Sequence, residues 1–221
     1  MKGLGLSRLL CGCLWPGLLL LFAAGPGAAA EIELLDVSRP ELPDWEVKTF
    51  HGKTRYQLTQ DVHGPCIRAD SAGTASGLFR KVRIDLQQTP YLHWRWKVDG
   101  VLANVHEREK RGDDFAARIY LIMSGGLFFW NTRAINYVWA NGQPIESLWD
   151  NPYTAHSAML AVESGGAHAG EWREYRRNVR EDIRRAFGRD ERYIDAVAIM
   201  TDTDNTGLSA SACYGAIGFS D

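Results

Sequence analysis

The chain has 221 residues, of which 45% are hydrophobic and 24% charged, and its formal net charge is −2. That length is typical of one domain. Because the sequence shows no strong excess of positive charge, we expect neither nucleic acid nor an anionic membrane surface as a partner.

The first thirty residues have the pattern of a cleavable signal peptide. Lys2 and Arg8 form a short positive region, an apolar stretch follows over residues 9–24, and residues 28–30 are all alanine. A membrane anchor is the alternative, but the stretch is interrupted and shorter than the roughly 20 residues that a span needs. We therefore expect residues 1–30 to be removed, the protein to be exported to the periplasm or secreted, and no stable membrane span to remain.

Residues 31–44 predict an N-terminal arm, since Pro40 and Pro43 interrupt any regular element, and residues 45–221 predict one domain. The patterns of residues 45–50 and 56–58, separated by a turn around Gly52, are typical of a β-hairpin. The clearest strand covers residues 91–98, where every second residue is apolar. Its expected core face consists of Leu92, Trp94, Trp96 and Val98.

The remaining chain predicts further short strands, with loops over residues 101–114, 142–153 and 164–170. Further strands are expected over residues 66–69, 78–86, 115–123, 134–140, 159–163, 196–200 and 210–219. One helix is expected over residues 178–187, with Asn178 as its N-cap and Gly188 as its stop. About ten strands that never alternate with helices exclude a doubly wound sheet and favour a mainly β, jelly-roll-type sandwich.

Two cysteines, Cys66 and Cys213, remain after removal of residues 1–30. In an oxidising compartment such a pair predicts a disulfide, and two separate buried thiols are the alternative.

Several motifs recur together in one known family. They are Tyr91 to Trp96, Gly112 to Tyr120, Ile135 to Trp139, Asn151 to Tyr153, Arg177 to Val179 and Thr201 to Gly207. In this combination the chain resembles DUF3047, a bacterial family of exported proteins of unknown function. The resemblance spans nearly all of the chain after residue 30. It implies a β-sandwich reminiscent of galactose-binding and other carbohydrate-binding folds, with no established activity.

Adjacent carboxylates at the entrance of a strand form the first candidate site. Asp113 and Asp114 precede Arg118, and together with Asp202 they could supply the acid and base of a glycan hydrolase. The alternative is structural, with Asp114 in a buried ion pair with Arg118 or Arg177.

The second candidate is a turn rich in oxygen side chains. Asp202, Asp204 and Asn205 stand before Gly207 and could hold a weakly bound, structural Ca²⁺, the only cofactor that the sequence suggests. The alternative is a tight turn in which these side chains bind their own backbone.

Aromatic and amide residues form the third candidate, because such residues are typical of sugar-binding platforms and equally of sandwich cores. The candidate ligand-binding residues are Arg118, Trp130, Asn136, Tyr137, Trp149 and Arg177. Trp130 and Trp149 are expected in loops, where ligand contacts are common. The histidines show no metal-binding spacing, and no known nucleophile or phosphate-binding motif occurs.

These observations favour a non-catalytic exported domain that binds a glycan or another envelope component. A glycan-directed hydrolase and a structural partner in an envelope complex are the alternatives.

Overall fold

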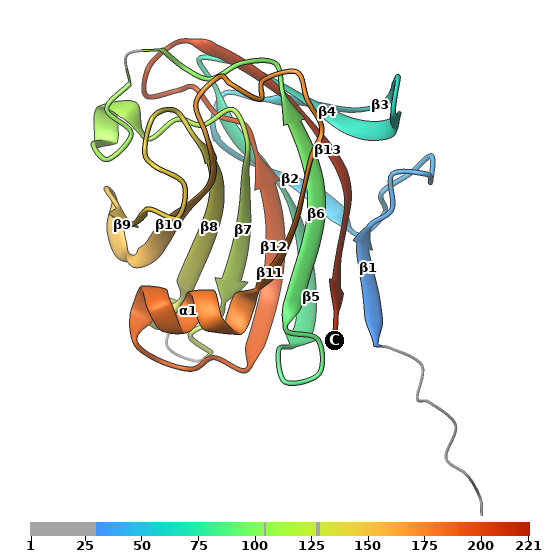
Figure 1. Cartoon of the computed structure of the whole chain (residues 1–221), viewed down its shortest axis with the longest axis vertical. Coiled ribbons are helices and arrows are strands. Elements are labelled where there is room, and N and C mark those ends of the chain that lie inside the picture. The colour runs from blue at the N-terminus through green and yellow to red at the C-terminus, as the bar shows by residue number, and fades with distance from the viewer. Residues whose placement is uncertain (1–29, 104, 127–128) are drawn as a thin grey trace, which may run out of the picture.

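The protein is a sandwich of two β-sheets in a computed structural model that describes residues 30–103, 105–126 and 129–221 (Figure 1). The expected signal peptide lies outside the described residues, apart from Ala30. In the part of the chain that the structure describes, no helix has the length and apolar character needed to cross a bilayer.

The six-stranded sheet has the order β11-β6-β13-β4-β3, and β1 pairs with β13 beside this path. Its strands are β1 (Glu31–Leu35), β3 (Arg55–Asp61), β4 (Gly64–Ala72), β6 (Tyr91–Val98), β11 (Arg173–Asn178) and β13 (Ser209–Ser220). All of its pairings are antiparallel.

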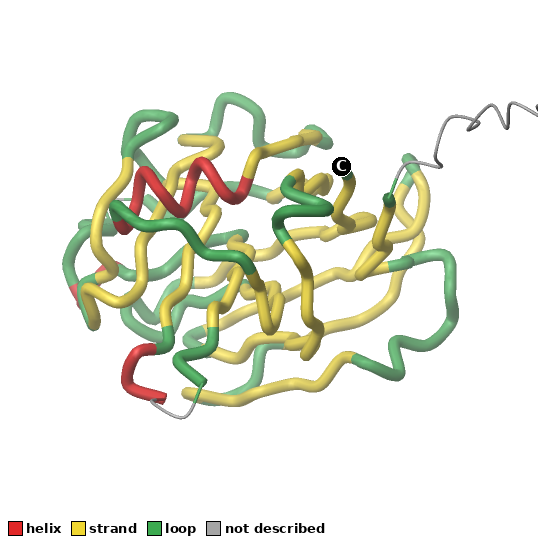
Figure 2. The backbone as a smooth tube through the Cα atoms, turned by 90° about the horizontal axis from the view of Figure 1, so that it is seen from below, coloured by secondary structure: helices red, strands yellow, loops and turns green. Residues whose placement is uncertain are grey.

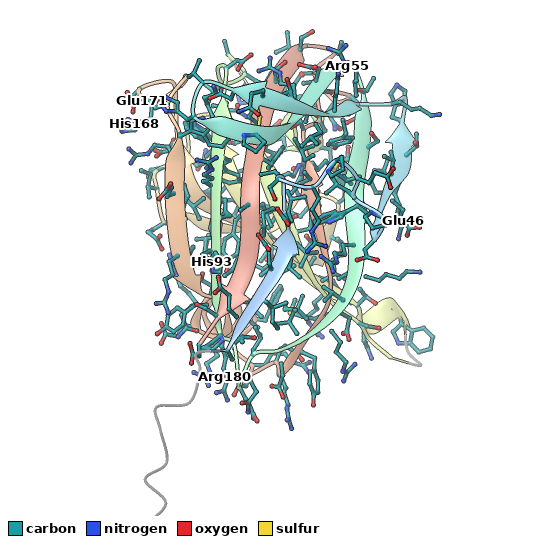
Figure 3. All side chains as sticks on the ribbon, turned by 90° about the vertical axis from the view of Figure 1, so that its right-hand side faces the viewer. Glu46, Arg55, His93, His168, Glu171 and Arg180 are labelled. Atoms are coloured by element: carbon teal, nitrogen blue, oxygen red, sulfur yellow. A yellow bond between two sulfur atoms is a disulfide. The ribbon has the colours of Figure 1, made fainter. Side chains whose placement is uncertain are left out.

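The seven-stranded sheet has the order β2-β5-β12-β7-β8-β10-β9. Its strands are β2 (Trp45–His51), β5 (Ala75–Asp85), β7 (Arg118–Met123), β8 (Arg133–Ala140), β9 (Leu148–Asn151), β10 (Thr154–Ser164) and β12 (Tyr193–Met200). The pair β8·β10 is parallel, and the other pairs are antiparallel. Figure 3 shows the sandwich from the side, with Glu46 of β2 and His93 of β6 on opposite flanks.

Alternating apolar residues of both sheets fill the space between them. In β6 the predicted core face is confirmed, since Leu92, Trp94, Trp96 and Val98 are all buried. Trp94 stacks on Tyr137 of β8 at 5.3 Å between ring centroids and on Tyr175 of β11 at 5.1 Å. The contact with Tyr137 joins the two sheets, and the contact with Tyr175 lies within the six-stranded sheet. Stacked aromatic rings of this kind bury large apolar areas.

The predicted helix is confirmed as α1 (Val179–Phe187), which lies at one end of the sandwich (Figure 2). The Asn178 side chain accepts a hydrogen bond from Glu181 N, and Gly188 ends the helix with a left-handed φ of 64°. Asp182 accepts hydrogen bonds from Tyr137 Oη of the seven-stranded sheet (2.9 Å) and from Arg177 Nε of the six-stranded sheet (2.7 Å). The helix is thereby bonded to both layers.

Several local predictions are wrong. The expected hairpin of residues 45–50 and 56–58 does not form, because β2 pairs with β5 and β3 pairs with β4 in the other sheet. The expected arm contains β1, and the expected loop 142–153 contains β9. The structure also has β11, where no strand was expected, and the described residues include two short 3₁₀ helices, Lys110–Gly112 and Phe129–Asn131.

Two buried groups hold long-range connections in place. Cys66 of β4 and Cys213 of β13 are joined by a disulfide, with their Cα atoms 5.6 Å apart. Glu107, in the loop before β7, accepts backbone N–H bonds from Asn141 (2.7 Å), Gly142 (2.9 Å) and Gln143 (2.7 Å). Glu107 therefore fixes the loop before β7 against the loop after β8.

Candidate functional site

A groove of about 760 Å³ lies on the outer face of the seven-stranded sheet. In β7, Ile119, Leu121 and Met123 point into the core, so the intervening Arg118, Tyr120 and Ile122 form part of the groove. The groove is also lined by Phe50, Ala75, Phe79, Asp113, Trp130, Thr132, Arg133, Ala134, Asn151, Tyr153, Thr154, His156, Ser157, Met200, Asp202, Asp204 and Asn205. A volume of this size is typical of small-molecule sites.

A second apolar cluster lies over β8, β9 and β10 on that face. It consists of Phe115, Val138, Ala140, Trp149, Met159 and Ala161. Phe115 belongs to the segment before β7 and Trp149 to β9, and their rings lie 6.5 Å apart. Because this cluster covers the sheet near Val138, the groove occupies the neighbouring part of the face.

The floor of the groove contains a buried arginine held by two acids. The guanidinium of Arg118, only 2% exposed, donates from Nε to Asp202 Oδ1 (2.8 Å) and from Nη2 to both Asp202 Oδ2 and the Asp113 carbonyl (2.8 Å). Arg118 Nη1 also lies 3.5 Å from Asp113 Oδ1. This bidentate arrangement is the strong form of an ion pair, and it fixes the loop of Asp202 to β7.

Asp113 is a buried acid with one carboxylate oxygen that makes no hydrogen bond within the described residues. Asn151 Nδ2 donates to its Oδ2 at 2.8 Å, whereas Oδ1 accepts no hydrogen bond from the described residues. Burial raises the pKa of the Asp113 carboxyl, and the nearby Arg118 opposes this with a smaller lowering effect. A raised pKa means that this carboxyl takes up a proton more readily than an exposed aspartate does.

The adjacent acid, Asp114, has a structural role. Its Oδ1 accepts from Asn205 N (3.2 Å) and Asn205 Nδ2 (3.1 Å), and its Oδ2 accepts from Thr206 N (2.7 Å). The predicted ion pair of Asp114 with Arg118 or Arg177 is therefore wrong. Arg118 pairs with Asp202 and Asp113, and Arg177 pairs with Asp182 and Glu146.

The oxygen-rich turn brings three carboxylates together. Oxygens of Asp114, Asp202 and Asp204 all lie within 4.8 Å of one another. Asp202 already receives two N–H groups of Arg118 and Asp114 receives three from the turn, so a cation would have to displace these donors. The calcium site stays a prediction, and the arrangement favours the alternative of a self-bonded turn.

Exposed aromatic rings surround the groove. Phe50 is 63% exposed, Trp130 57% and Tyr153 55%, and each lines the groove. Tyr153 is held in place, because its hydroxyl donates to Asn205 Oδ1 and the Lys110 ammonium lies 5.2 Å from its ring centroid. Phe50 packs against Phe79 at 6.3 Å between centroids.

The six predicted ligand-binding residues do not lie together in the structure. Arg118 and Trp130 line the groove, whereas Asn136, Tyr137 and Trp149 are buried and Arg177 lies beside helix α1. Asn136 Nδ2 donates to Ser157 Oγ and the Ala158 carbonyl, and its Oδ1 accepts no hydrogen bond from the described residues. Tyr137 belongs to the core, and Trp149 lies in a strand under Phe115, so three of the six candidates are in packed layers.

Sequence reasoning missed several groove residues, namely Phe50, Phe79, Tyr120, Tyr153 and His156. Tyr120 carried a usable signal, since it alternates with the core residues of its strand in step with Arg118. Among the described residues, no histidine belongs to a group of side chains that could hold a metal ion. His168 bonds Glu171 at 3.1 Å, and Figure 3 shows this pair at the far side from Glu46.

Comparisons with known proteins show how far this fold is shared. Residues 43–218 match the model of the family described as "Protein of unknown function (DUF3047)". No curated protein sequence matches the chain. Among solved structures, a family 11 carbohydrate-binding module of a cellulosomal cellulase of Clostridium thermocellum has a TM-score of 0.46 and 10% identity, over 87% of this chain and 95% of that one.

A cellulase derived from that of Rhodothermus marinus has a TM-score of 0.43 and 10% identity, over 86% of this chain and 100% of that one. The K2 cleaved adhesin domain of Lys-gingipain has a TM-score of 0.43 and 9% identity, over 86% of this chain and 99% of that one. At such low similarity none of these proteins informs the function of this one, so that function has to be derived from the groove itself.

Proposed function

The chain belongs to the DUF3047 family of proteins of unknown function, and we propose that it is an exported, non-catalytic domain that binds a glycan in the groove. Export follows from the signal-peptide pattern of residues 1–30, and the periplasm is the compartment that we propose. The Cys66–Cys213 disulfide suits an oxidising compartment of that kind.

One observation carries the binding proposal. Of the seven large hydrophobic side chains that are exposed among the described residues, three are aromatic, and all three line the groove. Exposed apolar surface is costly in a soluble protein, and its concentration in one concave site marks a ligand-binding surface. Aromatic rings beside carboxylates, amides and an arginine suit a ligand with apolar faces and polar edges, which describes a pyranose ring.

A glycan array followed by titration of tryptophan fluorescence tests this proposal. We expect Trp130→Ala to weaken binding about tenfold, since an aromatic contact contributes up to about 1.5 kcal/mol beyond its buried area. Ile145→Ala is the matched control, because Ile145 is 53% exposed and does not line the groove. A blank array at millimolar glycan, or equal weakening by both variants, would contradict the proposal.

A glycan-directed hydrolase is the second candidate, and Asp113 is the observation that favours it. This acid lines the groove, has a raised pKa and keeps one oxygen without a hydrogen bond among the described residues. Asp204 is a second carboxylate in the same groove, as a two-carboxylate mechanism needs. Release of reducing sugar by the wild type, abolished in Asp113→Asn with binding retained, would establish the hydrolase and replace the non-catalytic proposal.

A structural role in an envelope complex has less support. Such a role predicts a contiguous exposed apolar patch. Outside the groove, four exposed hydrophobics remain among the described residues: Val47 lies in β2, and Val62, Ile145 and Leu208 belong to three different connections between strands.

A further inference from the structure

The groove crosses the strands of its sheet. Its lining comes from all seven strands: the consecutive neighbours β2, β5, β12, β7, β8 and β10, and the last residue of β9, Asn151. The five spacings from β2 to β10 give a length of about 24 Å, which is the length of roughly four or five sugar residues in an extended chain. A single sugar ring would occupy only a small part of that length.

The exposed aromatic rings stand at opposite ends of this path. Phe50 belongs to β2, the edge strand at one side of the sheet, and Tyr153 lies in the turn between β9 and β10, at the other side. Figure 1 shows β2 and β9 well separated across the sheet. Trp130, in the 3₁₀ helix before β8, lies toward the Tyr153 side of the strand order.

The middle of the groove has a different character. Its one aromatic residue in the central strand β7, Tyr120, is not among the exposed rings, its aliphatic residues are Ile122, Ala134 and Met200, and its polar floor is formed by Asp113, Arg118 and Asp202. Because Arg118 pairs with Asp202 and lies near Asp113, the two carboxylates and one guanidinium of this floor carry at most one net negative charge. The centre can therefore accept the hydroxyl groups of an uncharged chain, while the ends offer aromatic rings.

We propose that the ligand is an extended, uncharged linear oligosaccharide, or an internal stretch of a longer chain, which lies across the strands and contacts Phe50 and Tyr153 together. This inference rests on the proposed function. A chain that spans both rings gains from linkage, since after one end is bound the second contact forms within the complex at high effective concentration. A mono- or disaccharide reaches only one of the two rings and has no such gain.

Isothermal titration with linear cello-, xylo- and chito-oligosaccharides of two to six residues tests this proposal. We expect affinity to rise with length and to level off at about four or five residues, because longer chains extend beyond the groove. For the five-residue probe, Phe50→Ala and Tyr153→Ala should each weaken binding about tenfold. For the two-residue probe, at most one of these variants should have an effect.

Val62→Ala is the matched control, because Val62 is 90% exposed and lies outside the groove. Unchanged urea midpoints should show that all variants remain folded. If the two-residue probe binds as tightly as the five-residue probe, or if one ring alone accounts for binding at every length, the linear-chain inference is wrong while glycan binding stands. If none of the probes binds at any length, the proposed function and this inference both fall.

Discussion

Replacing Arg118 with methionine tests whether the floor of the groove depends on one buried cation. Arg118 and Asp202 are each 2% exposed. The substitution removes three hydrogen bonds of the guanidinium, two to Asp202 and one to the Asp113 carbonyl. It also leaves the Asp202 carboxylate buried without a counter-charge.

The expected loss of stability is about 3–5 kcal/mol at pH 7, the usual cost of breaking a buried ion pair from one side. Three charge-assisted hydrogen bonds at about 1.5–3 kcal/mol each would give a larger sum, but such contributions overlap and are not additive. Acid should reduce the loss, since the stranded carboxylate no longer carries a buried charge once it takes up a proton.

Urea unfolding of the wild type and the Arg118→Met variant at pH 7 and at pH 4.5 measures both effects. The control is Arg133→Met, because the structure gives Arg133 no acidic partner within ion-pair distance among the described residues and the expected change is within about 0.5 kcal/mol. The double variant Arg118→Met with Asp202→Asn should recover part of the loss, because no uncompensated charge then remains at position 202. A loss below about 1 kcal/mol for Arg118→Met, or the same loss at both pH values, would refute this account of the floor.

Three further predictions concern groups around the groove. Asp113→Asn should be at least as stable as the wild type at pH 7. The pKa of Asp113 is raised on folding, so the wild type loses stability as the pH rises through the pKa of the folded state. Plots of unfolding free energy against pH for the wild type and the variant should converge below about pH 4, where the carboxyl is protonated in both the folded and the unfolded chain. Glu107→Ala should cost about 3 kcal/mol or more by urea unfolding, since three backbone N–H groups lose their acceptor, and Glu107→Gln, which keeps one acceptor oxygen, should cost less. Replacing Cys66 and Cys213 by alanine should cost about 2–5 kcal/mol, because the bridge closes a separation of 147 residues in the unfolded chain, and equal stability of the oxidised and reduced wild type would contradict this.

The sequence predicts the parts of the fold that depend on local pattern. The core face of β6 follows from alternation, and helix α1 follows from Asn178 and Gly188, since both signals arise within a few residues. The hairpin prediction failed because the turn after β2 crosses between sheets, which no local pattern reveals. Buried Thr54, just after that turn, bonds Ser76 Oγ in β5 and the Thr201 carbonyl after β12, and these partners lie far away in sequence.

The site was harder to predict for the same reason. Arg118, Asp113 and Asp202 were all singled out, but Arg118 and Asp202 are 84 positions apart, so the pair Arg118–Asp202 could not be distinguished from Arg118–Asp114. The groove itself depends on the order of strands in the sheet, which places Phe50 and Tyr153 on one surface. Asn136 has the outward parity of its strand, yet it is buried, and its sequence position gives no sign of that.

The two ends of the described chain meet on the side of the sandwich away from the groove. Asp221 N donates to the Ala30 carbonyl at 3.1 Å, next to the pairing of β1 with β13 in the six-stranded sheet. A tag, a bead or a fused domain joined at either position would therefore attach the protein through its six-stranded sheet and leave the groove accessible to solvent. The same closeness makes a circular permutant feasible, with a short linker across the old ends and new ends in an exposed turn such as that of Val62.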